Sequence, residues 1–137
     1  MTTYESRQKQ ILKPQETIYG LLSDLTHLES FRTHIPADKV KDLEFTADTV
    51  SASIDPIGRV TFRIVEREPC KTVKFGADNL PIQFNLWIQL VGVSDSDTRM
   101  KITVKADIPL MLKPMIGNKL EQGVEQMAEM LAAALNR

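Results

Sequence analysis

Cysteine is nearly absent from this chain, because Cys70 is the single cysteine among 137 residues. One cysteine cannot form a disulfide within the chain, and a domain without disulfides is typical of a reducing compartment. The first residues lack the apolar run of a signal peptide. No later apolar run approaches the ~20 residues that a membrane-spanning helix needs. These absences predict a cytoplasmic protein without stable membrane insertion.

An excess of charge of one sign is also absent. The chain carries 17 lysine and arginine residues against 18 aspartate and glutamate residues, for a formal net charge of −1. Proteins that bind nucleic acid usually present a strongly basic face to the phosphate backbone, so we expect no nucleic-acid partner. The length suits one hydrophobic core, and no linker, repeat or low-complexity segment divides it. We therefore expect a single domain over residues 1–137.

Patterns that bind metals or carry out nucleophilic catalysis are missing as well. His27 and His34 are the only histidines, and their seven-residue separation differs from the one-turn spacing of helical metal ligands. No Ser-His-Asp or Cys-His arrangement can be assembled from the sequence. We expect no metal and no cofactor, and we assign no catalytic residue.

The strongest pattern in the chain is the C-terminal stretch Met111–Asn136. Its apolar residues recur at intervals of three and four, which predicts one apolar stripe along a helix. The stripe consists of Ile116, Leu120, Val124, Met127, Leu131, Ala134 and Leu135. A helix of this length spans about 30 Å and needs an equally long apolar partner surface. Pro114 fits only in its first turn.

The N-terminal part predicts a strand over residues 3–12, followed by two short helices. Alternation along the strand places Gln8 and Gln10 on the side opposite Lys9. Two interpretations of that side remain open: it orients the polar group of a ligand, or it is a wet edge of the sheet. Pro14 opens the first helix. The second helix is expected over 27–34, with Thr26 as its N-cap.

The middle of the chain alternates apolar and polar residues with period two, which is typical of strands with one buried face. About six strands follow between residues 43 and 106, separated by turn sequences such as Asp55-Pro56-Ile57-Gly58. Their connections are short, so sequential strands should pair as an antiparallel meander. The fold class is therefore α+β, with the long last helix covering the apolar face of one sheet.

Residues 14–25, Pro-Gln-Glu-Thr-Ile-Tyr-Gly-Leu-Leu-Ser-Asp-Leu, carry a family resemblance. They are similar to the loose opening motif of the START and polyketide-cyclase superfamily, which includes the birch pollen allergen and coenzyme Q-binding proteins. The position and length of the last helix match that superfamily too. The resemblance implies a helix-grip fold, in which a curved sheet of about seven antiparallel strands grips the C-terminal helix across its concave face.

The resemblance also implies a cavity for a hydrophobic small molecule or lipid between the sheet and the last helix. We expect its lining among apolar positions of the strands and helix, together with the two glutamines of the first strand. These candidates are Gln8, Gln10, Phe45, Phe62, Phe75, Phe84, Leu86, Ile88, Ile102, Met115, Ile116, Leu120 and Met127.

Three functions fit this architecture. The first is binding of a hydrophobic molecule without chemical change. The second is an enzyme of cyclase or dehydratase type, which requires an acid or base with a shifted pKa in the same cavity. The third is a protein-interaction module, or a homodimer, with a filled core and an exposed apolar patch. No ionisable residue falls clearly on an apolar face, which favours the first function over the second.

Overall fold

The computed structural model describes residues 2–34, 40–54, 58–80 and 82–136, without the side chains of residues 30–34, 40 and 54. Its strands are β1 (Thr2–Glu5), β2 (Lys9–Ile11), β3 (Val40–Phe45), β4 (Thr49–Ile54), β5 (Gly58–Glu68), β6 (Thr72–Ala77), β7 (Phe84–Ser94) and β8 (Asp97–Ala106). Its helices are α1 (Gln15–Leu22), the 3₁₀ helix η1 (Leu25–His34) and α2 (Lys113–Leu135).

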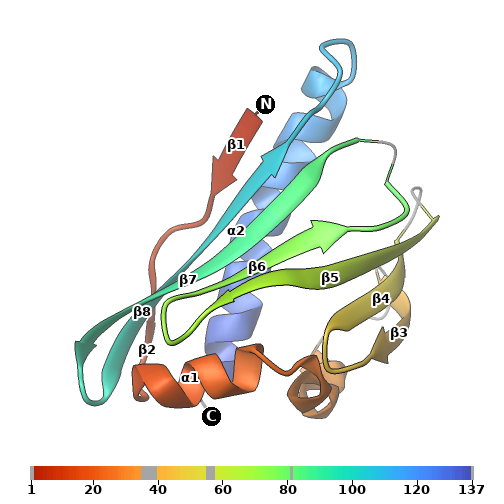
Figure 1. Cartoon of the computed structure of the whole chain (residues 1–137). Helices are drawn as coiled ribbons and strands as arrows, with labels where there is room; N and C mark the ends of the chain where they lie inside the picture. The colour runs from red at the N-terminus through yellow and green to blue at the C-terminus, as the bar shows by residue number, and fades with distance from the viewer. Residues whose placement is uncertain (1, 35–39, 55–57, 81, 137) are drawn as a thin grey trace.

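The strands form one antiparallel sheet with the order β1-β8-β7-β6-β5-β4-β3, and β2 also pairs with β8 (Figure 1). Strands β3 to β8 follow one another as the predicted meander. The first segment of the chain returns to lie beside the last strand, and α2 runs along one face of the sheet. The predicted α+β helix-grip architecture is confirmed.

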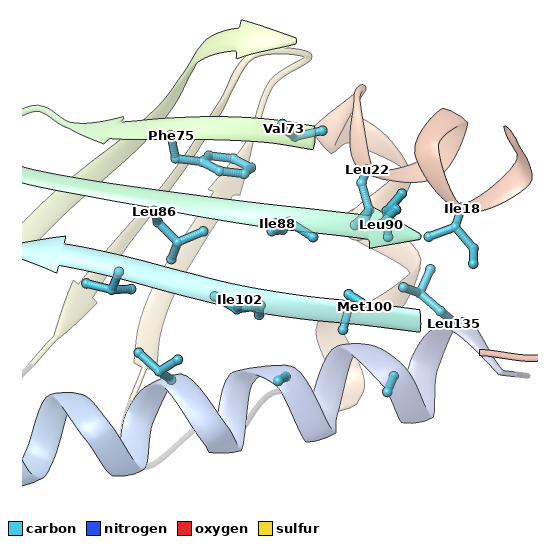
Figure 2. Close-up of a cluster of buried hydrophobic side chains, with 14 of the residues drawn as sticks. Ile18, Leu22, Val73, Phe75, Leu86, Ile88, Leu90, Met100, Ile102 and Leu135 are labelled. Atoms are coloured by element: carbon cyan, nitrogen blue, oxygen red, sulfur yellow. The ribbon is translucent and has the colours of Figure 1, made fainter. Parts of the chain in front are cut away.

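The core lies between this sheet and α2. The long helix packs chiefly against β8, β1 and β2 and also contacts η1. Buried side chains from α1, β6, β7, β8 and α2 form one continuous cluster (Figure 2). Where α2 is closest to the sheet its buried positions are mostly small, with Ala128 and Ala132 facing the core between Val124 and Leu135. Small side chains allow a helix to approach its partner surface closely.

The first strand is interrupted after Ser6, and this interruption corrects the predicted alternation. The Ser6 N–H donates to the carbonyl of Ile102, and its hydroxyl oxygen accepts the N–H of Ile102. Lys9 then pairs with Met100. From Ser6 to Lys9 the first segment advances three residues, whereas β8 advances only two, from Ile102 to Met100. One extra residue reverses which side chains face the core.

The reversal moves the two glutamines to the surface. Ile11 of β2 is fully buried, whereas Gln8 and Gln10 are exposed. Gln10 Nε2 instead donates to Asp97 Oδ2 at 3.1 Å, outside the core. The prediction that Gln8 and Gln10 face the interior, where they could bind a ligand, is therefore wrong.

The helix boundaries follow the predicted proline positions closely. Pro14 directly precedes α1, and Pro114 lies in the first turn of α2. The predicted N-cap of the second helix is wrong, because Thr26 donates from both its N–H and its hydroxyl to the Asp24 carboxylate (3.0 and 2.6 Å). Residues 55–57 of the turn predicted at 55–58 and the side chain of His34 fall outside the described residues, whereas Gly58 begins β5.

The face of the sheet turned away from α2 is polar, as its sequence predicts. Trp87 lies there between two lysines, with its ring centre 5.2 Å from Lys74 Nζ and 5.7 Å from Lys105 Nζ. These contacts suit the electron-rich face of an indole ring. The Thr103 hydroxyl beside them donates to Gln89 Oε1 at 3.1 Å.

Candidate functional site

Large apolar side chains remain half-buried on the face of the sheet that α2 covers in part. We call this set the inner apolar surface. Its members are partly exposed to solvent, all but Phe45 also pack against the buried core, and they come from four strands or their ends and from α2. They are Phe45, Val50, Phe62, Ile82, Phe84, Ile116, Leu120 and Met127.

The sheet side of the inner apolar surface is a row that crosses neighbouring strands. Phe45 of β3 pairs with Val50 of β4, which in turn pairs with Phe62 of β5. The Phe62 ring meets the Phe84 ring of β7 with centroids 5.7 Å apart and planes inclined by 52°. Tilted aromatic pairs of this kind are favourable beyond the area they bury. The row therefore forms an ordered apolar surface.

The helix side of this surface is the N-terminal half of α2. Ile116 and Leu120 are half-buried there, and Met127 is half-buried near the middle of the helix. Because α2 packs chiefly on the β1, β2 and β8 side, it leaves the apolar residues of β3 to β5 incompletely covered (Figure 1).

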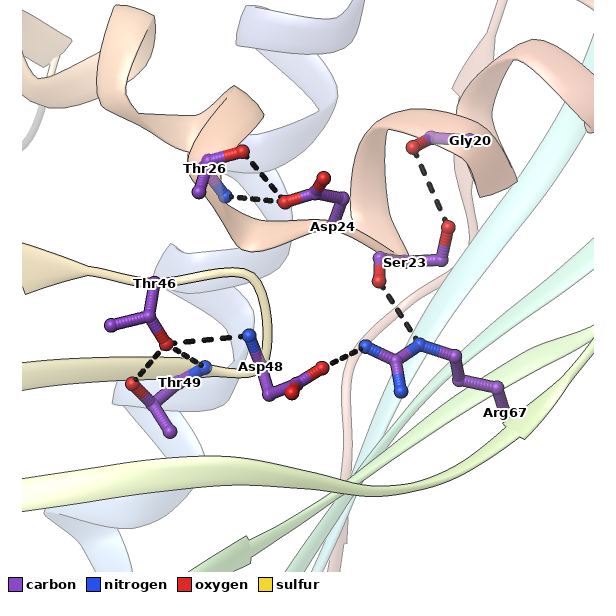
Figure 3. A network of polar contacts seen from close by, with 8 residues as sticks. All are labelled: Gly20, Ser23, Asp24, Thr26, Thr46, Asp48, Thr49 and Arg67. Carbon is purple, nitrogen blue, oxygen red and sulfur yellow. Dashed lines mark hydrogen bonds and ion pairs between the residues drawn. The ribbon is translucent and has the colours of Figure 1, made fainter.

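A polar network holds the β3–β4 hairpin, which carries Phe45 and Val50, against the start of η1 (Figure 3). Arg67 Nε donates to the Ser23 carbonyl at 3.0 Å, and Arg67 Nη2 donates to Asp48 Oδ1 at 2.5 Å. The Leu25 N–H donates to the carbonyl of Ala47 at 3.0 Å. One arginine on β5 thus links the α1–η1 junction to the hairpin at the open side of the surface.

The buried polar groups have structural partners. Among the described residues, the buried polar side chains are the hydroxyls of Ser6, Thr98 and Thr103, and no charged side chain is buried. Thr98 donates to the carbonyl of Lys13 at 2.8 Å, and Ser6 donates to that of Arg7 at 2.9 Å.

The Tyr4 hydroxyl is a different kind of polar group, because it lies on the inner side of the first segment against α2. The ring is half-buried, and Tyr4 pairs with the buried Val104. A side-chain carbon placed on Gly117 would be 3.1 Å from the Tyr4 oxygen. Glycine at 117 therefore leaves room for this hydroxyl at the N-terminal half of the helix.

An ion pair fixes the middle of α2 to the interrupted first strand. The Arg7 N–H donates to Glu125 Oε1 at 2.8 Å, and Lys9 Nζ pairs with Glu125 Oε2. The Lys9 side chain, followed by the Arg7 N–H, holds the pKa of Glu125 below its ordinary value. The carboxylate is thus ionised and serves to position the helix.

The structure separates the predicted lining residues into three groups. Phe75, Leu86, Ile88 and Ile102 are buried in the core. The half-buried group contains Phe45, Phe62, Phe84, Ile116, Leu120 and Met127. Gln8, Gln10 and Met115 are at the surface, and Met115 is 69% exposed.

Three residues of the site were missed by the sequence reasoning. Val50 lies on the same strand face as Ala52, so the period-two pattern already indicated that it faces the apolar side. Ile82 precedes β7 with the same parity as Phe84. Strict alternation would put Tyr4 on the same side as Gln8 and Gln10, and the break after Ser6 separates it from them.

Two hollows in the described part of the surface lie away from the inner apolar surface. The larger, about 440 Å³, lies between the start of α1 and the β7–β8 hairpin and is lined by Pro14, Gln15, Glu16, Gly92, Val93, Ser94 and Asp95. The smaller, about 140 Å³, is on the outer face beside Trp87. Both have polar linings, which suit a hydrophobic ligand poorly.

No family model and no curated protein sequence matches this chain. Solved structures do resemble it over nearly its whole length. Norcoclaurine synthase from Thalictrum flavum has a TM-score of 0.76 with 10% identity, covering 98% of this chain and 94% of that one. Protein MLL2253 from Mesorhizobium loti has a TM-score of 0.68 with 18% identity, covering 99% and 98%.

A third similar structure is the Aha1 dimer from Colwellia psychrerythraea, with a TM-score of 0.69, 17% identity and coverage of 99% and 95%. At these identities the likeness establishes the fold alone, which is the helix-grip fold. Within the described residues, no helix is both long and apolar enough to cross a bilayer.

Proposed function

We propose that this protein binds a hydrophobic small molecule or lipid on the inner apolar surface, between strands β3 to β7 and the N-terminal half of α2. One observation carries the proposal: large apolar side chains on both the sheet and the helix stay half-buried although they touch a complete core. Leaving such side chains in contact with water is unfavourable, and a ligand that covers them recovers part of that free energy.

The character of the surface supports binding without chemistry. The buried side chains of the described residues include no charge, so no buried acid or base is available beside the apolar row. A half-buried tyrosine hydroxyl is present instead. We propose that Tyr4 replaces Gln8 and Gln10 as the group that hydrogen-bonds the polar end of a ligand, since it lies on the inner side.

Native mass spectrometry of the gently purified protein tests the proposal first. We expect a reproducible additional mass that disappears on denaturation. A titration with the neutral fluorescent probe N-phenyl-1-naphthylamine then locates the site. Leu120→Gln and Phe62→Leu should each weaken probe binding by about fivefold or more, because each reduces half-buried apolar area.

Val91→Thr is the matched control, because Val91 is an exposed apolar residue at another place on the sheet. It should change probe affinity by less than about twofold, in line with small effects of surface substitutions. Circular dichroism must show that each variant is folded. Probe binding that is equally strong in the folded Leu120→Gln, Phe62→Leu and Val91→Thr variants would exclude the inner apolar surface.

A further inference from the structure

Arg67 is a charged residue on the face of β5 that otherwise carries apolar side chains. Val60 and Ile64 are buried on this face, and Phe62 is half-buried there. Arg67 pairs with the fully buried Val73 of β6, so its side chain starts from the same face of the sheet. Charged side chains are uncommon on the apolar face of a sheet, and this one therefore calls for a structural or functional reason.

An irregularity in the pairing of β5 with β6 directs the arginine to this face. From Ile64 to Arg67 the strand β5 advances three residues, whereas β6 advances only two, from Phe75 to Val73. Strict alternation from Ile64 would instead direct Glu66 toward the apolar face. A bulge of this kind re-aims the side chains that follow it. The bulge thus places a guanidinium, and not a carboxylate, at this position.

We propose that Arg67 is a positioning residue for the ligand site. It sets where the β3–β4 hairpin stands relative to the α1–η1 junction, and thereby where Phe45 and Val50 stand in the inner apolar surface. This inference rests on the proposed function, because the inner apolar surface is the proposed binding site. It deepens that function by assigning control of ligand affinity to a residue that is not itself a member of the surface.

The guanidinium of Arg67 joins the two elements through different nitrogens. Its Nε donates to the carbonyl of Ser23, the C-cap of α1, and its Nη2 donates to the carboxylate of Asp48 in the hairpin turn (Figure 3). The last carbonyls of a helix lack partners within it and favour a nearby cation. Because the donors of a guanidinium stand at fixed angles in one plane, the two bonds together fix the distance between the helix end and the hairpin.

The hairpin turn is stiffened by its own hydrogen bonds, so it carries its apolar side chains as one unit. The Thr46 N–H donates to the carbonyl of Thr49 at 2.9 Å, and the Thr49 N–H donates to the Thr46 hydroxyl oxygen at 3.0 Å. Phe45 and Val50 flank this turn and pair with each other. A shift of the turn away from Arg67 is therefore transmitted to both apolar side chains.

Loss of the arginine should affect the position of the hairpin more than the stability of the fold. The side chains of Arg67 and Asp48 are 38% and 59% exposed, and exposed ion pairs contribute little to stability. Two backbone hydrogen bonds remain at the hairpin without the arginine. The Leu25 N–H donates to the carbonyl of Ala47 at 3.0 Å, and the Ile64 N–H donates to the carbonyl of Asp48 at 2.8 Å. We expect the hairpin to stay folded and the Leu25 bond to open more often.

Arg67→Met tests the inference, with Arg63→Met as its matched control. Arg63 lies on the outer face of the same strand and donates from Nε and Nη2 to Asp78 Oδ2, at 3.2 and 3.0 Å. Amide hydrogen exchange of the ligand-free protein, followed by NMR, should be at least about threefold faster at Leu25 in Arg67→Met and unchanged in Arg63→Met. Binding of N-phenyl-1-naphthylamine should weaken about threefold in Arg67→Met alone, while both variants show similar urea midpoints.

Two further variants separate the contacts of the guanidinium. Arg67→Lys should bind the probe with intermediate affinity, because an ammonium group can reach one of the two acceptors but lacks the rigid fork of donors. Asp48→Asn should also weaken binding. The double variant Arg67→Met/Asp48→Asn should bind the probe no more weakly than Arg67→Met, because both substitutions break the same pair.

Two results would overturn the inference and leave the proposed ligand site intact. Exchange at Leu25 that is no faster in Arg67→Met than in Arg63→Met would show that the arginine does not hold the hairpin. Wild-type probe affinity in Arg67→Met, where Leu120→Gln and Phe62→Leu have weakened binding, would show that the position of the hairpin does not control affinity. Unchanged affinity in Leu120→Gln and Phe62→Leu would instead exclude the inner apolar surface, and the role of Arg67 with it.

Discussion

The two halves of α2 belong to one continuous helix, yet they meet the rest of the molecule differently. In the C-terminal half, Ala128 and Leu135 are fully buried in the core. In the N-terminal half, Ile116 and Leu120 are only half-buried, and Met115 is largely exposed. The apolar stripe is similar along both halves, so periodicity alone does not distinguish them.

This difference shows how one element can supply both stability and a binding surface. Small residues allow the C-terminal half to sit close to β8, and that contact anchors the helix. The N-terminal half also lies against the first segment, where Gly117 faces Tyr4, but its larger side chains Ile116 and Leu120 stay half-buried. A rigid scaffold that holds incompletely buried apolar groups is a general requirement for a pre-formed ligand site.

The largest expected effect is a difference in the free energy of unfolding between a variant of Leu135, at the end of α2, and a variant of Leu110, in the turn before α2. Leu135→Ala should lower the free energy of unfolding by about 2–5 kcal/mol, because it leaves a cavity in a fully buried site. Leu110→Ala should change it by less than about 0.5 kcal/mol, because that side chain is exposed. Urea denaturation monitored by circular dichroism measures both.

Leu120→Ala provides the intermediate point of this series. Its half-buried position predicts a loss between those of the other two leucine variants. A loss equal to that of Leu135→Ala would show that the N-terminal half is covered as fully as the C-terminal half. The proposed ligand surface would then have to be abandoned.

The next effect concerns the ion pair that joins the middle of α2 to the first strand. Glu125→Gln should lower stability at neutral pH by about 0.5–1 kcal/mol, since the pair is partly exposed and screened by solvent. The pKa of Glu125 is lowered in the folded protein, so the stabilisation is complete above its ordinary pKa. It should disappear as the pH falls through the lowered value.

Denaturation of the wild type and Glu125→Gln across acidic and neutral pH measures this difference. The two stability curves should converge on acidification, because protonation removes the charge that the substitution removes at neutral pH. Curves that stay a constant distance apart would show that the wild-type carboxylate does not act through its charge. Glu129→Gln is a suitable control, because Glu129 lies farther from Lys9 Nζ, at 3.7 Å, and is more exposed.

Most of the fold could be predicted because each strand and helix repeats its period several times. Four alternating apolar residues lie in β7, and seven residues at helical spacing lie in α2. The first segment is the exception. A single inserted residue after Ser6 reversed the facing of Gln8 and Gln10, and no local sequence pattern marks such a bulge.

The candidate site could be predicted only as a set of apolar positions. Periodicity placed Phe62 and Phe75 on the same face, but the structure buries Phe75 and leaves Phe62 half-buried. That difference depends on where α2 crosses the sheet, which is a property of tertiary packing. Met115 is exposed although its neighbour Ile116 packs against the core, because adjacent residues of a helix point to different sides.

The smallest expected effect uses the two glycines of α2 as a matched pair. An added methyl group at Gly123 meets no described atom within 4 Å, so Gly123→Ala should stabilise the protein by about 0.5–1 kcal/mol through helix propensity. At Gly117 the same methyl group would lie 3.1 Å from the Tyr4 hydroxyl. Gly117→Ala should therefore stabilise the protein less than Gly123→Ala.

Tyr4→Phe distinguishes this contact from other differences between the two positions. Removing the hydroxyl should raise the stabilisation from Gly117→Ala toward that from Gly123→Ala, and it should leave the effect of Gly123→Ala unchanged. A thermal or urea double-mutant cycle measures the coupling between residues 4 and 117. A coupling near zero would show that the tyrosine ring moves aside freely. The Tyr4 hydroxyl would then lack the fixed position that its proposed hydrogen bond to a ligand requires.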